Sequence, residues 1–377
     1  MAHIVDTYFK KAGCNDDHGY DTTCMVYFTY CEFVITLFFM ASTYLLIVDS
    51  TEDLSVRTYG VLCFAIEFFI FSFIVIRLYY QSQYRDMYQR SRGVGIPENF
   101  KNKIATVIKH HLIMPNLFAV VSVLYTISSE SVKIGDPFTF PFVDVLPIKT
   151  TTVAVYVFKY ILYALPVYIA HIEVSFLHVT YMYTTGVLQC HFQILNEQVK
   201  ESMVNTDEQK LRITIKHHQE MLKFFKEMKT VFEKPVFLVI VSYGLYIGLT
   251  SCLIIQVIQG FIHQIILGLC IVSSLEGILT IIIYCVYTSN LDNLHDGLLN
   301  GLFKHRLFYS RNKSFNYLIL IMMTRATIPL EFKAGSIFTV NINLLVKILK
   351  FAYTVLNVLL TSINHQVIKT TVQKQII

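Results

Sequence analysis

Tryptophan is absent from this chain of 377 residues, and charged residues are scarce, at 15% of the composition. A soluble globular protein carries about 25% charged residues. The low charge and a mean hydropathy of +0.52 therefore exclude most soluble classes. Without tryptophan, anchoring at the membrane–water interface falls to the 24 tyrosines. The apolar residues come in long blocks, so we predict an all-α integral membrane protein.

Catalytic and metal-binding motifs are also missing. Gly93-Val94-Gly95 lacks the third glycine and the strand–helix context of a nucleotide-binding loop. His110-His111 and His217-His218 are adjacent pairs, and neighbours on a helix do not face one site. We therefore expect no metal, no cofactor and no enzyme activity. The net charge of +5 is distributed by membrane side, which also speaks against nucleic-acid binding.

Seven apolar blocks predict membrane-spanning helices, each of which needs roughly 20 residues. The predicted spans are residues 25–48, 58–80, 112–129, 153–179, 235–258, 261–287 and 335–363. We treat residues 1–377 as a single seven-helix membrane domain.

The orientation of the bundle follows from its lysines and arginines, which concentrate on the cytoplasmic side of membrane proteins. Segments on one side hold 20 of them (1–24, 81–111, 180–234 and 288–315). Segments on the other side and the C-terminal tail hold five. The N-terminus is therefore predicted to be cytoplasmic and the C-terminus extracellular, the reverse of a G-protein-coupled receptor.

Two stretches, approximately 186–232 and 288–332, are predicted to form cytoplasmic anchor helices. The first carries apolar rows at 3–4 spacing, such as Leu188, Phe192, Leu195 and Val199, and such rows need a packing partner. Either these helices continue spans four and five and pack on each other, or they bind a separate protein. In the second, residues 317–323 form an apolar stretch of only about 10 Å, too short to cross, so we expect a short helix packed on the bundle.

The last span carries a polar row. Its members are Asn343, Lys347, Lys350, Thr354, Asn357 and Thr361, at spacings of 4, 3, 4, 3 and 4. This spacing places all six on one helical face, over about 27 Å. Lipid does not solvate such a row, so it must face water or a polar interior. It either lines a pore between several copies or packs within one subunit, as in a transporter.

Two further sets of residues in the spans are candidate functional groups. Aromatic residues in the outer halves of spans two to four are suited to line an apolar ligand pocket, although core packing explains them equally well. They are Phe64, Phe68, Phe69, Tyr125, Tyr156, Tyr160 and Tyr163. His171, Glu173 and His178 are ionisable residues in or near span four, which marks them for function. Packing in a wet environment at the cytoplasmic end is the simpler interpretation.

At this point the sequence resembles the insect odorant receptors. Gln189–Leu195, which follows Leu165-Pro166, resembles the family's cytoplasmic extension of the fourth helix. Residues 328–360 resemble its C-terminal pattern. The pattern comprises Pro329, Ala334-Gly335, Phe338, Ile348-Leu349-Lys350 and Ala352-Tyr353-Thr354. The Thr-Tyr and Gln-Phe signature of the related gustatory receptors is not found.

The resemblance implies a ligand-gated, non-selective cation channel in the plasma membrane of olfactory sensory neuron dendrites. It implies a heterotetramer of a tuning subunit with a shared co-receptor, and this chain is too short to be the co-receptor. The ligand, a small volatile odorant, is expected in the outer half of spans two, three, four and six. The last helix is expected to line the pore, with Val358, Thr361 and Ser362 at the gate, although two of these three depart from a purely apolar gate.

Two other classes of protein remain as alternatives. A metabotropic seven-helix chemoreceptor requires the opposite topology. A secondary transporter predicts saturable uptake instead of channel openings.

Overall fold

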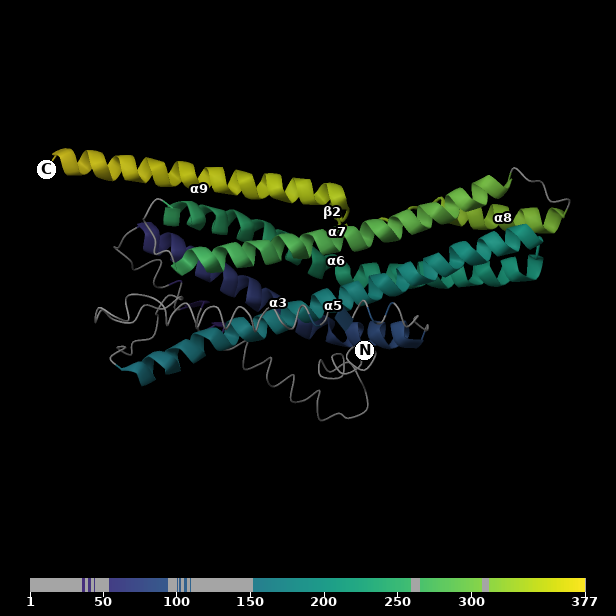
Figure 1. Ribbon diagram of the computed structural model, residues 1–377, viewed down its shortest axis with the longest axis horizontal. Coiled ribbons are helices and arrows are strands. Elements are labelled where there is room, and N and C mark those ends of the chain that lie inside the picture. The colour runs from purple at the N-terminus through teal and green to yellow at the C-terminus, as the bar shows by residue number, and fades with distance from the viewer. Residues whose placement is uncertain are drawn as a thin grey trace.

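The computed structural model describes residues 54–93, 152–258, 265–306 and 312–376, with isolated positions at 36–44 and 100–109. The described elements are helices apart from one antiparallel hairpin (Figure 1). The helices are α3 (Leu54–Gly93), α5 (Val153–Asn205), α6 (Glu208–Ile258), α7 (Ile265–Arg306), α8 (Lys313–Ala326) and α9 (Ile342–Ile376). The strands are β1 (Lys333–Ala334) and β2 (Phe338–Thr339), with Lys333 opposite Thr339 and Ala334 opposite Phe338. In the described part, the predicted all-α class is confirmed.

Three of the helices are far longer than a bilayer is thick. α5 has 53 residues, α6 has 51 and α7 has 42. At 1.5 Å per residue α5 alone is about 80 Å long, whereas the hydrocarbon core of a bilayer is about 30 Å thick. Each of these helices therefore extends well beyond the apolar block that the sequence marks in it.

α5 and α6 are joined by only two residues, Thr206 and Asp207. Thr206 has the left-handed angles φ 49° and ψ 37°, which end α5, and its N–H donates to the carbonyl of Ser202. The carboxylate of Asp207 accepts from the N–H of Lys210 at 3.0 Å and so caps α6. So short a turn makes the two helices antiparallel neighbours.

The ends of α5, α6 and α7 meet α8 in a four-helix region at the right of Figure 1. We call it the distal bundle (residues 181–205, 208–234, 288–306 and 313–326). The predicted apolar row lies in its core, since Leu188, Phe192, Leu195 and Val199 are at most 2% exposed. Leu211 and Phe232 of α6 are 0% exposed beside them. α8 contains the short apolar stretch 317–323 and packs on this core, as predicted.

The remainder, which we call the apolar half, comprises residues 54–80, 153–180, 235–258, 265–287 and α9. α9 runs away from the distal bundle (Figure 1) and packs chiefly against α6, with fewer contacts to α7. Among the described residues, one helical stretch, Glu208–Ser251, meets the length and hydropathy expected of a membrane span.

The last predicted span begins too early. Residues 335–341 belong to the hairpin and its exit, and the helix begins at Ile342. Gly335 and Ser336 have φ angles of 58° and 59°, a left-handed conformation that cannot continue into a helix. The predicted spans 58–80, 153–179 and 235–258 lie inside α3, α5 and α6, and 261–287 begins four residues before α7. Span 112–129 and most of 25–48 lie outside the described residues.

Candidate functional site

One face of α9 holds it on the rest of the chain. Leu344, Ile348 and Ala352 are buried on this face, at 2%, 5% and 5% exposure. The facing part of α6 carries Gly244 and Gly248, one helical turn apart. A Cβ atom on Gly248 would lie 2.9 Å from Cγ1 of Val355 and 3.2 Å from the carbonyl oxygen of Ala352. Glycine therefore permits this close approach of the two helices, as small residues do between membrane helices.

The polar row lies on another face of α9. Asn343, Lys347, Lys350, Thr354, Asn357 and Thr361 are all exposed in the single chain. Val358, the first of the three gate positions, is 60% exposed. The side chain of Ser362 lies outside the described residues. Among the described residues nothing covers the row, which leaves it open to lipid, water or a neighbouring chain.

The hydroxyl groups of this row are already partly satisfied within the helix. The Thr354 hydroxyl donates to the carbonyl of Lys350 at 2.9 Å, and the Thr361 hydroxyl donates to the carbonyl of Asn357 at 2.8 Å. A threonine that donates to its own helix keeps the lone pairs of its oxygen free to accept. The row therefore presents acceptor oxygens outward at these two positions.

A third face of α9 is exposed and apolar. Ile342, Val346, Leu349 and Tyr353 are between 42% and 63% exposed. Each of them precedes a member of the polar row by one residue, which is about 100° around the helix. α9 thus has a packed face, a polar face and an apolar face. Within the described part of the chain, the first of these faces is the covered one.

The structure describes only some of the aromatic side chains that are predicted to bind a ligand. Phe64 is half-buried, with its ring centroid 6.3 Å from that of Tyr44. Phe68 is 47% exposed and meets Phe69 edge-on at 6.1 Å. Tyr125 and the side chains of Tyr156, Tyr160 and Tyr163 lie outside the described residues. The described residues do not bring these aromatics together, and their ligand role stays a prediction.

Ionisable residues are buried in the apolar half. His178 is 2% exposed, and its Nδ1 lies 2.8 Å from the hydroxyl of Tyr284, which fits the packing interpretation. The side chains of His171 and Glu173 lie outside the described residues. Lys159 is 0% exposed, and Arg77 at 6% lies 5.0 Å above the ring of Phe176. The sequence reasoning missed Lys159, although an ionisable residue inside an apolar block was signal enough.

In the distal bundle, histidines from different helices contact one another, whereas those adjacent in the sequence do not share a partner. His217 of α6 faces His191 of α5, with Nε2 and Nδ1 3.1 Å apart. The adjacent His218 instead stacks on His295 of α7, at 6.0 Å between ring centroids. Burial lowers the pKa of His217, His218 and His295, and that of His218 falls to about 4. These three rings are therefore neutral near pH 7. Among the described residues, no three metal-ligating side chains converge.

Asp292 lies on α7, three residues before His295. Burial, together with the charges of Asp296 and Glu331, raises the pKa of its carboxyl to about 7. Its Oδ1 is buried without a hydrogen-bond partner among the described residues. The ionised form of Asp292 is therefore disfavoured in the folded protein.

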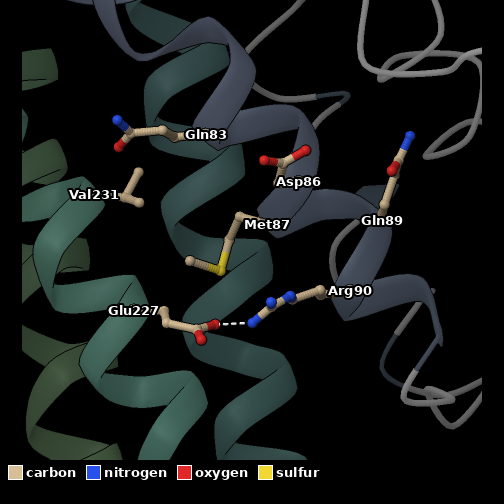
Figure 2. A pocket seen from close by; sticks show the side chains of 7 residues that line it. All are labelled: Gln83, Asp86, Met87, Gln89, Arg90, Glu227 and Val231. Atoms are coloured by element: carbon tan, nitrogen blue, oxygen red, sulfur yellow. Dashed lines mark hydrogen bonds and ion pairs between the residues drawn. The ribbon is translucent and has the colours of Figure 1, made fainter.

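Two hollows with charged residues in their linings lie near the place where the end of α3 meets α6. Figure 2 shows the first, of about 340 Å³, crossed by the ion pair between Arg90 and Glu227. The second, of about 630 Å³, shares that pair and also contacts His191, His217 and Lys223. Their charged linings differ from the apolar pocket predicted for the ligand. They lie near the distal bundle, away from Phe64 and Phe68.

Comparison with known proteins agrees with this arrangement. The sequence pattern of the family described as 7tm Odorant receptor matches residues 79–353. Odorant receptor 85a of Drosophila melanogaster is 22% identical over 180 residues, which are 46% of this chain and 44% of that protein. The chain thus matches less than half the length of this curated relative.

Two solved structures share the fold. The insect olfactory receptor OR5 of Machilis hrabei in complex with eugenol aligns with a TM-score of 0.74, at 14% identity, over 92% of both chains. A second structure of the same receptor aligns with a TM-score of 0.68, at 14% identity, over 88% of this chain and 87% of the other. At this identity the likeness establishes the fold alone.

The helical bundle and its likeness to these structures define the class of fold, the one seen in the insect olfactory receptor. The match over residues 79–353 then gives the family, and the chain belongs to the 7tm odorant receptors. The resemblance drawn from the C-terminal pattern is confirmed.

Proposed function

We propose that this chain is a tuning subunit of an odorant-gated, non-selective cation channel, which assembles with a shared co-receptor as a heterotetramer. The observation that carries the proposal is the exposed polar row of α9. A polar row some 27 Å long is costly against lipid and is stabilised where several copies enclose water. Its Thr354 and Thr361 oxygens keep lone pairs for a passing cation.

The three faces of α9 support this use of the helix. The buried face fixes α9 on α6, the polar face is free to line a pore, and the apolar face is free to meet lipid or a neighbouring subunit. Lys347 and Lys350 lie within the first three turns of the helix, where long side chains can extend toward water at a wide mouth. Asn357, Val358, Thr361 and Ser362 lie farther along and are the proposed narrow part.

The orientation and the ligand belong to the same proposal. The N-terminus and the distal bundle lie in the cytoplasm, the C-terminus lies outside, and the protein resides in the plasma membrane of olfactory neurons. The ligand is a small apolar or weakly polar volatile, bound near Phe64, Phe68, Tyr125, Tyr156, Tyr160 and Tyr163. Ligand binding stabilises the open arrangement through its higher affinity for that state.

Cysteine substitution along α9 tests the pore directly. Thr354→Cys and Asn357→Cys place a thiol on the polar row, and Val346→Cys and Tyr353→Cys place one on the apolar row as matched controls. The chain is expressed with the insect co-receptor, with G-protein signalling blocked, and currents are recorded during puffs of an odorant panel that includes eugenol. A charged, water-soluble thiol reagent is then applied.

We expect odorant-dependent cation current that the reagent reduces in the polar-row variants and leaves unchanged in the apolar-row variants and the unmodified chain. Equal modification of both rows would contradict the pore assignment. A current abolished by the G-protein block would favour a metabotropic receptor, and saturable uptake without channel openings would favour a transporter. Glycosylation of a sequon added to the C-terminal tail tests the orientation separately.

A further inference from the structure

The hairpin before α9 is bonded to α6 at the point where the proposed pore helix begins. The N–H of Gly335 donates to the carbonyl of Glu233 at 3.0 Å. The hydroxyl of Ser336 donates to the carboxylate of the same glutamate. On the first arm of the hairpin, the ammonium group of Lys229 donates to the carbonyl of Glu331 at 3.3 Å. Three contacts thus join the hairpin to a single stretch of α6.

A tight side-chain contact lies beside these hydrogen bonds. A Cβ atom on Gly335 would lie 2.6 Å from two ring atoms of Phe237, closer than side-chain carbons approach one another. The same ring stacks on Phe338 of β2, at 6.0 Å between centroids and 17° between planes. Phe237 therefore occupies the space that only a glycine at 335 leaves, and the φ of 58° at this position suits glycine as well.

The hairpin is also fixed to the core of the chain and to α9. Phe332 is 0% exposed and meets the ring of Tyr181 edge-on at 5.7 Å. The N–H of Val340 donates to the carbonyl of Phe332 at 3.0 Å, which closes the hairpin. The side chain of Asn341 then accepts from the N–H of Leu344 at 3.2 Å and caps α9. A packed, hydrogen-bonded link therefore runs from the core into the first turn of the helix.

We propose that Gly335, Phe237, Ser336 and Glu233 form a joint that positions α9 on α6 and thereby sets the balance between the closed and open channel. This inference rests on the proposed channel function. Among the described residues, α9 packs through one face on α6 and α7, so its position depends on that face and on the segment that leads into it. The joint lies on the segment of chain that leads directly into the first turn of α9. A change in its shape tilts or turns α9 and alters the free-energy difference between the two states.

The experiment enlarges the side chain at Gly335 and then tests whether a smaller side chain at Phe237 compensates for it. Gly335→Ala and Gly335→Asn each add a Cβ, and asparagine tolerates the left-handed backbone, which separates the steric effect from the backbone effect. Phe237→Leu is then added to each. Gly301→Ala is the matched control, because a Cβ on Gly301 meets nothing within 4 Å. Odorant dose–response, deactivation rate, permeability ratios and surface expression are measured for every variant with the co-receptor.

We expect both Gly335 variants to change the half-maximal odorant concentration or the deactivation rate by about fivefold or more, the usual scale of an allosteric coupling. Phe237→Leu should bring the Gly335→Ala channel back to within about twofold of wild type. Permeability ratios should stay unchanged throughout, because the joint does not line the proposed pore. A structural role alone would lower surface expression and leave the dose–response where it was.

Two milder variants keep the inference testable if the Gly335 variants do not reach the surface. Ser336→Ala and Glu233→Gln remove or weaken the same hydrogen bond, from the Ser336 hydroxyl to the Glu233 carboxylate, without adding volume. Both should therefore shift gating in one common direction. Surface-expressed variants that all gate as wild type does would overturn the joint while leaving the channel intact. A wild-type chain that carries no odorant-gated current would instead overturn the proposed function, and the joint with it.

Discussion

The distal bundle and the apolar half of this chain differ in how their apolar side chains are placed. The distal bundle buries its apolar rows within the chain, and its helices end in caps such as Thr206, Asp207 and Asn312. In the apolar half, large side chains such as Phe158, Ile161, Leu275 and Val346 are between 51% and 57% exposed. Both regions contain buried core residues, and in the apolar half large apolar side chains also lie exposed on α5, α7 and α9.

The difference shows what each region needs from its surroundings. A helix end that projects into water must bury an apolar stripe to be stable, so the distal bundle is packed like a small soluble protein. A helix in lipid gains little by burying apolar side chains, because lipid tails are equally apolar. Close packing in the apolar half therefore follows the inner faces of its helices, where Ile74, Val239 and Ile281 are at most 1% exposed, and the outer faces keep apolar side chains exposed.

The largest effect should come from Phe192 in the distal bundle. This residue is 0% exposed, and its ring meets those of His295 and His218 at 5.6 and 6.1 Å. Phe192→Ala should destabilise the protein by about 3–5 kcal/mol through lost burial and the cavity left behind. Tyr353→Ala, at a position 63% exposed on α9, is the control and should cost less than about 1 kcal/mol. Thermal unfolding in detergent measures both, and equal losses would contradict the comparison.

The next effect concerns the tight contact in the apolar half. Gly248→Ala places a carbon 2.9 Å from Val355, so α9 must shift or lose stability, by about 1–3 kcal/mol. Gly301→Ala, in an open part of α7, is the control and should be neutral or slightly stabilising, because alanine favours helix. Thermal unfolding and surface expression report the difference. A Gly248→Ala protein as stable as the control would show that α9 is not held closely here.

A smaller, pH-dependent effect is expected at Asp292. Its pKa, about 7 in the folded protein, exceeds the ordinary value of 3.8. The folded protein therefore loses stability as pH rises from about 4, and the loss is complete above about pH 7. Asp292→Asn should relieve roughly 1–2 kcal/mol at pH 8, after allowance for partial exposure, and almost nothing at pH 4.5. Unfolding midpoints at the two pH values decide this, and a gain independent of pH would assign it to another cause.

The smallest effect should come from the ion pair across the first hollow. Arg90 and Glu227 are 57% and 32% exposed, and such pairs contribute up to about 1 kcal/mol. Arg90→Gln should therefore lower stability by less than about 1 kcal/mol, and added salt should shrink the difference further. Unfolding at low and high ionic strength measures it. A loss of several kcal/mol would mean that the hollow is drier than its lining suggests.

Sequence patterns correctly predicted features that depend on one helix alone, such as which residues share a face. Apolar blocks located the helices, and the 3–4 spacing of Leu188, Phe192, Leu195 and Val199 correctly predicted a buried row. The polar row of α9 was visible in the same way, because residues at such spacings share a face whatever the surroundings. The beginning of α9 was placed too early because Ile337, Phe338 and Val340 are as apolar as the helix that follows them.

Contacts between helices were beyond the reach of these patterns. The adjacency of His217 and His218 correctly indicated that they do not share a site, but not that each meets a histidine on a different helix. Nor did the sequence indicate that Phe237 fills the space beside Gly335, about 100 residues away. Which helix stands next to which, and at what rotation, depends on the packing of all of them together.

The sequence by itself determined that the chain is a helical membrane protein, which family it resembles and which residues of α9 share a polar face. These properties depend on composition, periodicity and local motifs. The tertiary structure decided that this face is left uncovered, that glycines bring α6 close to α9 and that the hairpin joins the helix to α6. Such features depend on which side chains meet across helices, because an approach of 3 Å is set jointly by residues far apart in the chain.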